Sequence, residues 1–222
     1  MSAKNRGKNP RSLKRKTEST AVRTTLRVYV EGVTTEPEYI DALKRLPEFI
    51  DSVSVDVSIE EAGATPMRLV EAACADKRRA DLDIDSYWCV FDVESPDRHP
   101  HLDRARQMAR DNGVHLAISN PCFEVWLILH HVRHSGHLST NAAIQLRNEL
   151  DDSGGKHLDG PLYMKMVDEA IRRAGSLREK HRRDCTDFPH DNPSSSMDRF
   201  VLDMRAALKT GAPRTEPTAD CD

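Results

Sequence analysis

Apolar and polar positions along the first 135 residues follow two repeating periods, one typical of strands and one typical of helices. Short runs rich in β-branched and aromatic residues, as in strands of a covered sheet, occupy positions 23–30, 53–59, 87–91 and 114–119. After each run, apolar residues recur every three or four positions, as on one face of a helix, across 37–46, 66–79, 101–111 and 123–131. This strand–helix alternation predicts an α/β fold with a mostly parallel sheet flanked by helices on both faces.

The pattern changes after residue 135, where helical periods follow one another without strands between them. We expect helices over 138–150, 163–174 and 197–208, with a polar, irregular stretch at 176–196. Neither end of the chain shows a period. We therefore divide the chain into a basic disordered tail at 1–22, an α/β core at 23–135, a helical C-terminal portion packed on that core at 136–208, and a disordered tail at 209–222.

Composition narrows the class of protein. The chain has 222 residues, 38% hydrophobic and 31% charged, which suffices for one sizeable domain. No apolar stretch approaches the roughly 20 residues of a membrane span, and no signal-peptide core follows the charged N-terminus. Five cysteines are scattered without a CxxC pair, a pattern of reduced compartments that favours neither a disulfide framework nor a zinc site. We expect a cytoplasmic protein with no membrane partner.

Charge is unevenly distributed, although the net charge is only −3. Lys and Arg dominate positions 4–23, whereas the ends of two predicted strands are acidic. A block of like charge is usually a solvated tail, and a basic arm would also attract phosphates without regard to sequence. These two interpretations are compatible, and the asymmetry permits a polyanionic partner.

Carboxylates follow two of the predicted strands at the point where each strand stops. Glu31 comes directly after the strand at 23–30, and Asp92 and Glu94 follow the strand at 87–91. In an open α/β sheet, ligands gather at the carboxyl ends of the strands. If the two strands are neighbours, three carboxylates converge and repel one another unless a cation lies between them. The sequence therefore predicts a divalent metal site.

Each further acidic residue has a structural and a functional interpretation. Glu31 is a metal ligand, a general base or an exposed strand-end carboxylate, and Gly32 behind it lets the backbone turn tightly or approach a phosphate. Glu36 either favours a helix start through the macrodipole or binds a second metal. Glu124 opens an apolar helix, where a charge is costly unless it is paired or bound to metal. Asn120 orients a ligand or makes a turn.

Basic residues and histidines give weaker signals. Lys180 and Arg182 belong to a short basic run that is usually solvated surface. In a phosphoryl-transfer enzyme, one of them would stabilise the charge of the reacting phosphate. The histidines show no zinc spacing with the cysteines. His130 and His131 end an apolar helix and are interpreted as capping or packing residues.

Three ordered blocks carry a resemblance to a known family. They are Val30-Glu31-Gly32-x-x-Thr35-Glu36-Pro37-x-Tyr39, Phe91-Asp92-x-Glu94, and Ser119-Asn120-Pro121-Cys122-Phe123-Glu124-Val125-Trp126. In this order and spacing the chain resembles the RloB-like family, over roughly 23–208. That family is associated with bacterial restriction and phage-defence loci and has a TOPRIM-like fold, the metal-binding α/β domain of type II topoisomerases and primases.

The resemblance implies an Mg²⁺- or Mn²⁺-dependent enzyme that cleaves phosphodiesters in antiphage defence. Glu31, Glu36, Asp92, Glu94 and Glu124 would be the metal ligands, and Glu31, Asp92, Glu94 and Lys180 the catalytic residues. The second acidic motif of TOPRIM proteins is commonly Asp-x-Asp, whereas this chain has Asp92-Val93-Glu94. Because Mg²⁺ demands near-ideal octahedral geometry, the longer Glu94 side chain changes how this ligand reaches the ion.

Two alternatives remain open beside a nuclease acting on DNA or RNA. The first is a non-catalytic TOPRIM-like protein that binds nucleic acid or an ATPase from the same defence locus. The second is a phosphoryl-transfer enzyme acting on a nucleotide. Topoisomerase chemistry is disfavoured, because it needs a tyrosine nucleophile and usually a much larger chain.

Overall fold

The computed structural model describes residues 23–59, 64–79, 83–151, 155 and 157–208. The tails predicted at 1–22 and 209–222 lie outside these residues. No helix in the described ranges combines the length and the apolar character that crossing a membrane requires.

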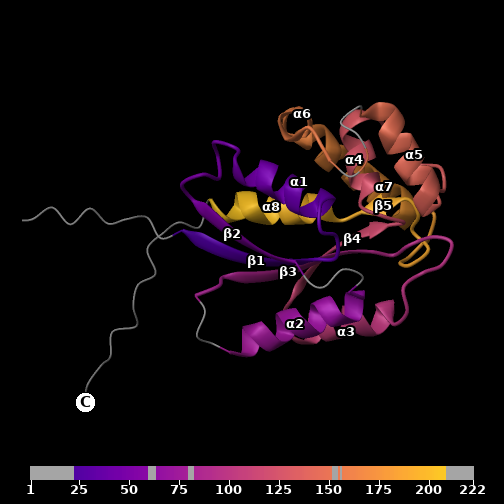
Figure 1. The fold of residues 1–222 in the computed structure, drawn as a ribbon. Helices are drawn as coiled ribbons and strands as arrows, with labels where there is room; N and C mark the ends of the chain where they lie inside the picture. The colour runs from indigo at the N-terminus through magenta and orange to yellow at the C-terminus, as the bar shows by residue number, and fades with distance from the viewer. Residues whose placement is uncertain (1–22, 60–63, 80–82, 152–154, 156, 209–222) are drawn as a thin grey trace, which may run out of the picture.

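A five-stranded sheet in the order β2-β1-β3-β4-β5 forms the middle of the molecule (Figure 1). The strands are β1 (Thr24–Val30), β2 (Val53–Ile59), β3 (Ser86–Asp92), β4 (His115–Asn120) and β5 (Ser194–Ser195). The first four pair in parallel, as predicted, and β5 runs antiparallel to β4. The pairing of β1 with β3 makes the two strands with acidic ends neighbours. The two-residue β5 was not predicted, because it is too short to show a period.

Helices cover both faces of this sheet (Figure 1). One face carries α2 (Pro66–Arg78) and α3 (Leu102–Asp111). The other carries α1 (Thr35–Lys44), α4 (Glu124–His131), α5 (Thr140–Leu150), α6 (Gly160–Lys165), α7 (Val167–Arg183) and α8 (Met197–Ala207). The mostly parallel α/β fold predicted from the sequence is therefore confirmed.

The course of the chain from 160 to 183 differs from the sequence prediction. Tyr163 lies in the short α6, and α7 continues to Arg183 through a stretch that was predicted to be irregular. The exposed side of this helix is charged and carries ion pairs three and four residues apart, such as Glu179–Arg182 and Lys180–Asp184. Such pairs stabilise a helix surface. Because charged residues dominate this stretch, its few apolar positions do not show a clear helical period in the sequence.

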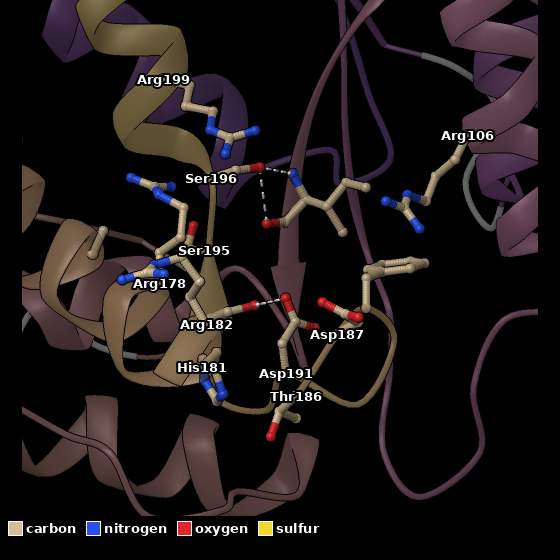
Figure 2. A pocket seen from close by; sticks show the side chains of 14 residues that line it. Arg106, Arg178, His181, Arg182, Thr186, Asp187, Asp191, Ser195, Ser196 and Arg199 are labelled. Atoms are coloured by element: carbon tan, nitrogen blue, oxygen red, sulfur yellow. Dashed lines mark hydrogen bonds between the residues drawn. The ribbon is translucent and has the colours of Figure 1, made fainter. Parts of the chain in front are cut away.

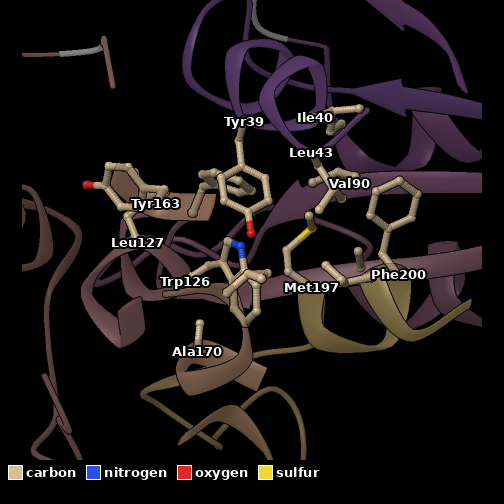
Figure 3. Close-up of a cluster of buried hydrophobic side chains, with 14 of the residues drawn as sticks. Tyr39, Ile40, Leu43, Val90, Trp126, Leu127, Tyr163, Ala170, Met197 and Phe200 are labelled. Atoms are coloured by element: carbon tan, nitrogen blue, oxygen red, sulfur yellow. The ribbon is translucent and has the colours of Figure 1, made fainter. Parts of the chain in front are cut away.

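Two hydrophobic clusters fill the space between the sheet and its helices. Leu69, Phe91 and Ala105 belong to the cluster under α2 and α3. The larger cluster joins residues of the strands to residues of the C-terminal helices, among them Trp126 and Phe200 (Figure 3). The C-terminal portion thus shares one continuous core with the sheet.

A buried histidine lies at the centre of this larger cluster. His130 is 1% exposed, with Nδ1 2.9 Å from the Trp126 carbonyl oxygen and Nε2 3.1 Å from the Tyr39 hydroxyl. In the neutral imidazole one nitrogen donates and the other accepts, so Nδ1–H donates to Trp126 and Nε2 accepts from Tyr39. Burial lowers the pKa of His130 to about 3. The packing role expected for this residue agrees with its surroundings.

We predict that His130 makes the protein sensitive to mild acid. In the unfolded chain its pKa is near 6.5, so below that pH the unfolded state binds a proton that the folded state excludes. The free energy of unfolding should therefore fall by about 2 kcal/mol from this residue between pH 7 and pH 5. Urea unfolding at both pH values should show a smaller fall in His130→Gln, even though this variant is less stable at pH 7. Equal falls in both proteins would contradict the assignment.

Candidate metal centre

The carboxyl ends of β1 and β3 bring Glu31 and Asp92 together. Val30 pairs with Val90 across the two strands, and the Glu31 N–H donates to the Val90 carbonyl oxygen at 3.3 Å. The Asp92 N–H donates to Glu31 Oε2 at 3.5 Å. The parallel register therefore places both carboxylates at the same edge of the sheet.

Asp92 is the centre of a cluster of acidic side chains. Burial raises its pKa well above the usual value, and the charges of Glu36, Glu124, Glu31 and Glu94 raise it further. Within the described part of the chain, the buried Asp92 Oδ1 has no hydrogen-bond partner. A buried carboxylate oxygen is normally satisfied by a donor or a cation. The geometry thus leaves one oxygen at the centre of the cluster for a ligand.

A cavity of about 180 Å³ opens in front of Asp92. Glu36, Glu94 and Glu124 line it, so four of the five predicted metal ligands share one space. The fifth, Glu31, is not among the lining residues, although its carboxylate contacts the Asp92 backbone. The cavity is built from the ends of two strands, the beginnings of α1 and α4, and α5, which contributes Thr140.

Gly32 makes room for the Glu36 carboxylate. A Cβ atom built on Gly32 would lie 2.6 Å from Glu36 Oε1 and closer still to Oε2. Real Cβ contacts of this length essentially do not occur, so any other residue would displace the carboxylate. Glu36 lies in the first turn of α1 and is only 7% exposed. The helix dipole favours an acid there, and its position in the cavity also suits it as a metal ligand.

Thr140 holds Glu94 in place from the C-terminal portion of the chain. Glu94 has a backbone φ of 69°, which is uncommon and unfavourable for a residue with a side chain. Its N–H donates to the Pro121 carbonyl oxygen at 2.8 Å, and the Thr140 hydroxyl donates to Glu94 Oε2 at 2.6 Å. The Ser95 N–H in turn donates to Thr140 Oγ1 at 3.1 Å. Thr140 was not predicted, since nothing in its sequence surroundings marks it.

His99 contacts the far side of Glu31, another arrangement that the sequence did not indicate. Its Nε2 lies 3.0 Å from Glu31 Oε1, although the N–H is not well directed at that oxygen. The contact with Glu31 raises the pKa of His99. Cys122 also lines the cavity, and burial raises the pKa of its thiol, which disfavours a thiolate nucleophile.

The remaining candidates lie elsewhere. Asn120 donates to the Pro189 carbonyl oxygen at 3.1 Å and to Asp191 at 3.0 Å, so it holds a C-terminal loop and makes no contact in the carboxylate cavity. Lys180 donates to Asp184 at 2.8 Å and lines a different cavity, between α4 and α7. Arg182 is paired with Glu179. The structure therefore gathers the acidic candidates and leaves both basic ones outside their cavity.

The donor set fits a hard divalent cation. Across the described ranges, no three His, Cys, Asp or Glu side chains are already arranged to hold one metal ion. Mg²⁺ does not require such a cage, because it keeps several waters and is usually bound through one or two carboxylates together with substrate phosphates. The partnerless Asp92 oxygen, the adjacent Glu36, Glu94 and Glu124 carboxylates and the space left by Gly32 meet that requirement.

The sheet order and the acidic cavity at its carboxyl edge define an α/β protein whose architecture is consistent with a TOPRIM-like fold. The chain belongs to the RloB-like family, because the family model described as RloB-like protein matches residues 26–204. Neither a curated protein nor a solved structure matches the chain.

Thr140→Val should weaken Mn²⁺ binding about tenfold, because residues that orient metal ligands typically contribute 10- to 100-fold in affinity. The substitution keeps the shape of the side chain and removes the hydrogen bond to Glu94. Titration calorimetry with Mn²⁺ measures the effect. Thr24→Val, at the opposite end of β1, is the matched control and should bind normally. Equal affinities in the two variants would refute the role of Thr140.

Gly32→Ala should displace the Glu36 carboxylate and weaken Mn²⁺ binding as much as Glu36→Gln does. Because both changes remove the same group from the cavity, the double variant should bind no worse than either single one. Gly175→Ala is the control, since a Cβ there meets no atom within 4 Å. Additive losses in the double variant would show that Gly32 acts through something other than Glu36.

Proposed function

We propose that this protein is an Mg²⁺- or Mn²⁺-dependent nuclease that cleaves phosphodiester bonds of DNA or RNA in bacterial antiphage defence. The observation that carries the proposal is Asp92, whose buried Oδ1 has no partner in the described ranges and whose neighbours are four glutamates. Carboxylate oxygens are the ligands that these hard cations prefer. Membership of the RloB-like family supports the same activity.

The residues of the cavity divide between binding and positioning. Asp92, with Glu36, Glu94 and Glu124, would hold the cation. When bound, the cation supplies Lewis-acid polarisation of the phosphodiester. Thr140 fixes Glu94 through its hydroxyl, and Gly32 leaves the space that the Glu36 carboxylate occupies.

Glu31 is the candidate general base. Its carboxylate accepts from the Asp92 N–H and is not among the residues that line the cavity, so we do not assign it as a direct ligand of the cation. His99 lies 3.0 Å from Glu31 Oε1 and contacts the carboxylate from its other side. In this assignment Glu31 takes the proton of the attacking water at a carboxylate oxygen.

Asp92→Asn should abolish the cleavage, lowering the rate at least about 100-fold, because the amide has the same shape but binds cations poorly. The measurement is cleavage of labelled single-stranded DNA, double-stranded DNA, RNA and tRNA, with Mn²⁺ or with EDTA. Asp51→Asn is the matched control, since Asp51 is 95% exposed and lies before β2.

Two outcomes would refute the proposal that this site is a nuclease. Cleavage that persists in EDTA or in Asp92→Asn would come from another site or from a contaminant. No cleavage of any polymer would favour one of the alternatives, and turnover of mononucleotides with polymers untouched would identify a nucleotide phosphoryl-transfer enzyme.

A further inference from the structure

A second charged cavity lies at the edge of the sheet where β5 ends it. Its volume is about 320 Å³, and it opens between α3, β5 and the helices α7 and α8 (Figure 2). Arg106, Arg178, Arg182 and Arg199 line it, and we call these four residues the arginine groove. An adjoining cavity of about 310 Å³ shares Arg106 and Arg199 with it.

Two of these arginines are neutralised by acids of the protein. Arg178 forms a two-pronged ion pair with the buried Asp198, and Arg182 forms one with Glu179. Their charges are therefore largely compensated. The Arg178–Asp198 pair joins α7 to α8, and both pairs leave little positive charge for a ligand.

The charges of the other two arginines, Arg106 and Arg199, are only weakly compensated by ion pairs. Arg199 is exposed, and no ion pair or hydrogen bond of its guanidinium is found within the described ranges. Arg106 has only a 3.8 Å ion pair with Asp103, whose side chain is 83% exposed, and such a pair contributes little. Figure 2 shows the Arg106 and Arg199 side chains reaching into the groove from α3 and α8.

One wall of the groove orients Arg106, and another anchors the beginning of the helix that carries Arg199. The Arg106 guanidinium lies 4.1 Å from the centre of the Phe188 ring, a cation–π contact that orients it. The start of α8 is anchored to β4, because the Ile118 N–H donates to Ser196 Oγ at 2.8 Å and the Ser196 N–H donates to the Ile118 carbonyl oxygen at 2.9 Å. Two cations held across one cavity repel each other unless an anion lies between them.

Two aspartates also line the groove. Asp191 lines it but accepts hydrogen bonds from Asn120 at 3.0 Å and from Ser194 at 3.1 Å. Asp187 lies next to Phe188 and also lines the groove. These hydrogen bonds come from neutral groups and hold Asp191 against the loop without removing its charge. The two weakly paired guanidinium groups therefore share the groove with two aspartates.

The register of the sheet relates the groove to the metal centre. Asp92 pairs with Ser119 on β4, and Ser119 pairs with Ser195 on β5, which lines the groove. Neighbouring strands lie about 4.8 Å apart, so Ser195 is roughly 10 Å from Asp92. At about 3.4 Å per nucleotide along a strand, that is about three nucleotides.

We propose that Arg106 and Arg199 bind a backbone phosphate of the nucleic acid, a few nucleotides from the bond that the metal centre cleaves. This inference rests on the proposed nuclease function and narrows its substrate to polynucleotides long enough to reach both places. Arginine suits the role, because its planar guanidinium matches phosphate geometry. Phosphate contacts position a strand without reading its sequence. The groove would therefore fix where the strand lies relative to the metal centre and would not select particular bases.

The test measures binding separately from cleavage. In the Asp92→Asn background, fluorescence anisotropy with a labelled 12-nucleotide single strand compares Arg106→Gln/Arg199→Gln with Arg104→Gln/Arg68→Gln. The control pair removes the same charge from exposed positions on α3 and α2 that line neither cavity. Circular dichroism checks that both proteins fold.

We expect the groove variant to bind about tenfold more weakly and the control to bind normally. The slope of log affinity against log salt should fall by about 0.7, which corresponds to one phosphate contact on a single strand. The loss should be the same for strands of different sequence. Equal affinities and slopes in the two proteins would overturn the proposal.

Inorganic phosphate tests whether the groove binds a free anion instead of a polynucleotide. Millimolar phosphate could protect the parent protein, but not the groove variant, against thermal unfolding. If the groove variant then still binds the oligonucleotide normally, the groove holds a free phosphate and the proposal is wrong. Cleavage decides the nuclease independently, because a protein that binds through the groove but cuts nothing keeps this inference and fails the proposed function.

Discussion

The close packing of four glutamates around Asp92, whose Oδ1 is buried, is the constraint on which the rest of the structure depends. Burial and like charge both oppose the ionisation of Asp92, and only a fold with compensating contacts keeps the group in such a place. The parallel pairing of β1 with β3 makes this convergence unavoidable, because it ends both strands at one edge. A divalent cation at that edge would offset the repulsion among these carboxylates.

The C-terminal portion of the chain completes this site. Thr140 on α5 fixes Glu94 in an unfavourable backbone conformation, and Asn120 at the end of β4 holds the loop that carries Asp191. The larger hydrophobic cluster joins the strands to α7 and α8 in one core. The helix α5 that lines the cavity therefore belongs to the same packed unit as the sheet and the other C-terminal helices.

Two groups of charged side chains lie at different places on the sheet. Acidic groups gather at the carboxyl ends of the strands, whereas Arg106 and Arg199 face one another at the sheet edge, two strands away. A nuclease of the proposed kind would use both kinds of site, because the phosphates of a nucleic acid repel a bare acidic cavity unless a cation bridges them. Weakly paired arginines nearby would attract the strand, and the cation would then neutralise the phosphate at the point of reaction.

The sequence by itself determined the alternating elements of the α/β sheet and the acidic residues at the strand ends. Strand and helix periods and strand-end carboxylates are local signals, and a resemblance in three ordered blocks added the family. Only the tertiary structure decided that Thr140 and His99 serve the acidic cluster, that Lys180 and Asn120 lie outside its cavity and that α7 runs to Arg183. Contacts such as Thr140–Glu94 join residues 46 positions apart, and no local period encodes them, because they arise only when separate elements pack on the same sheet.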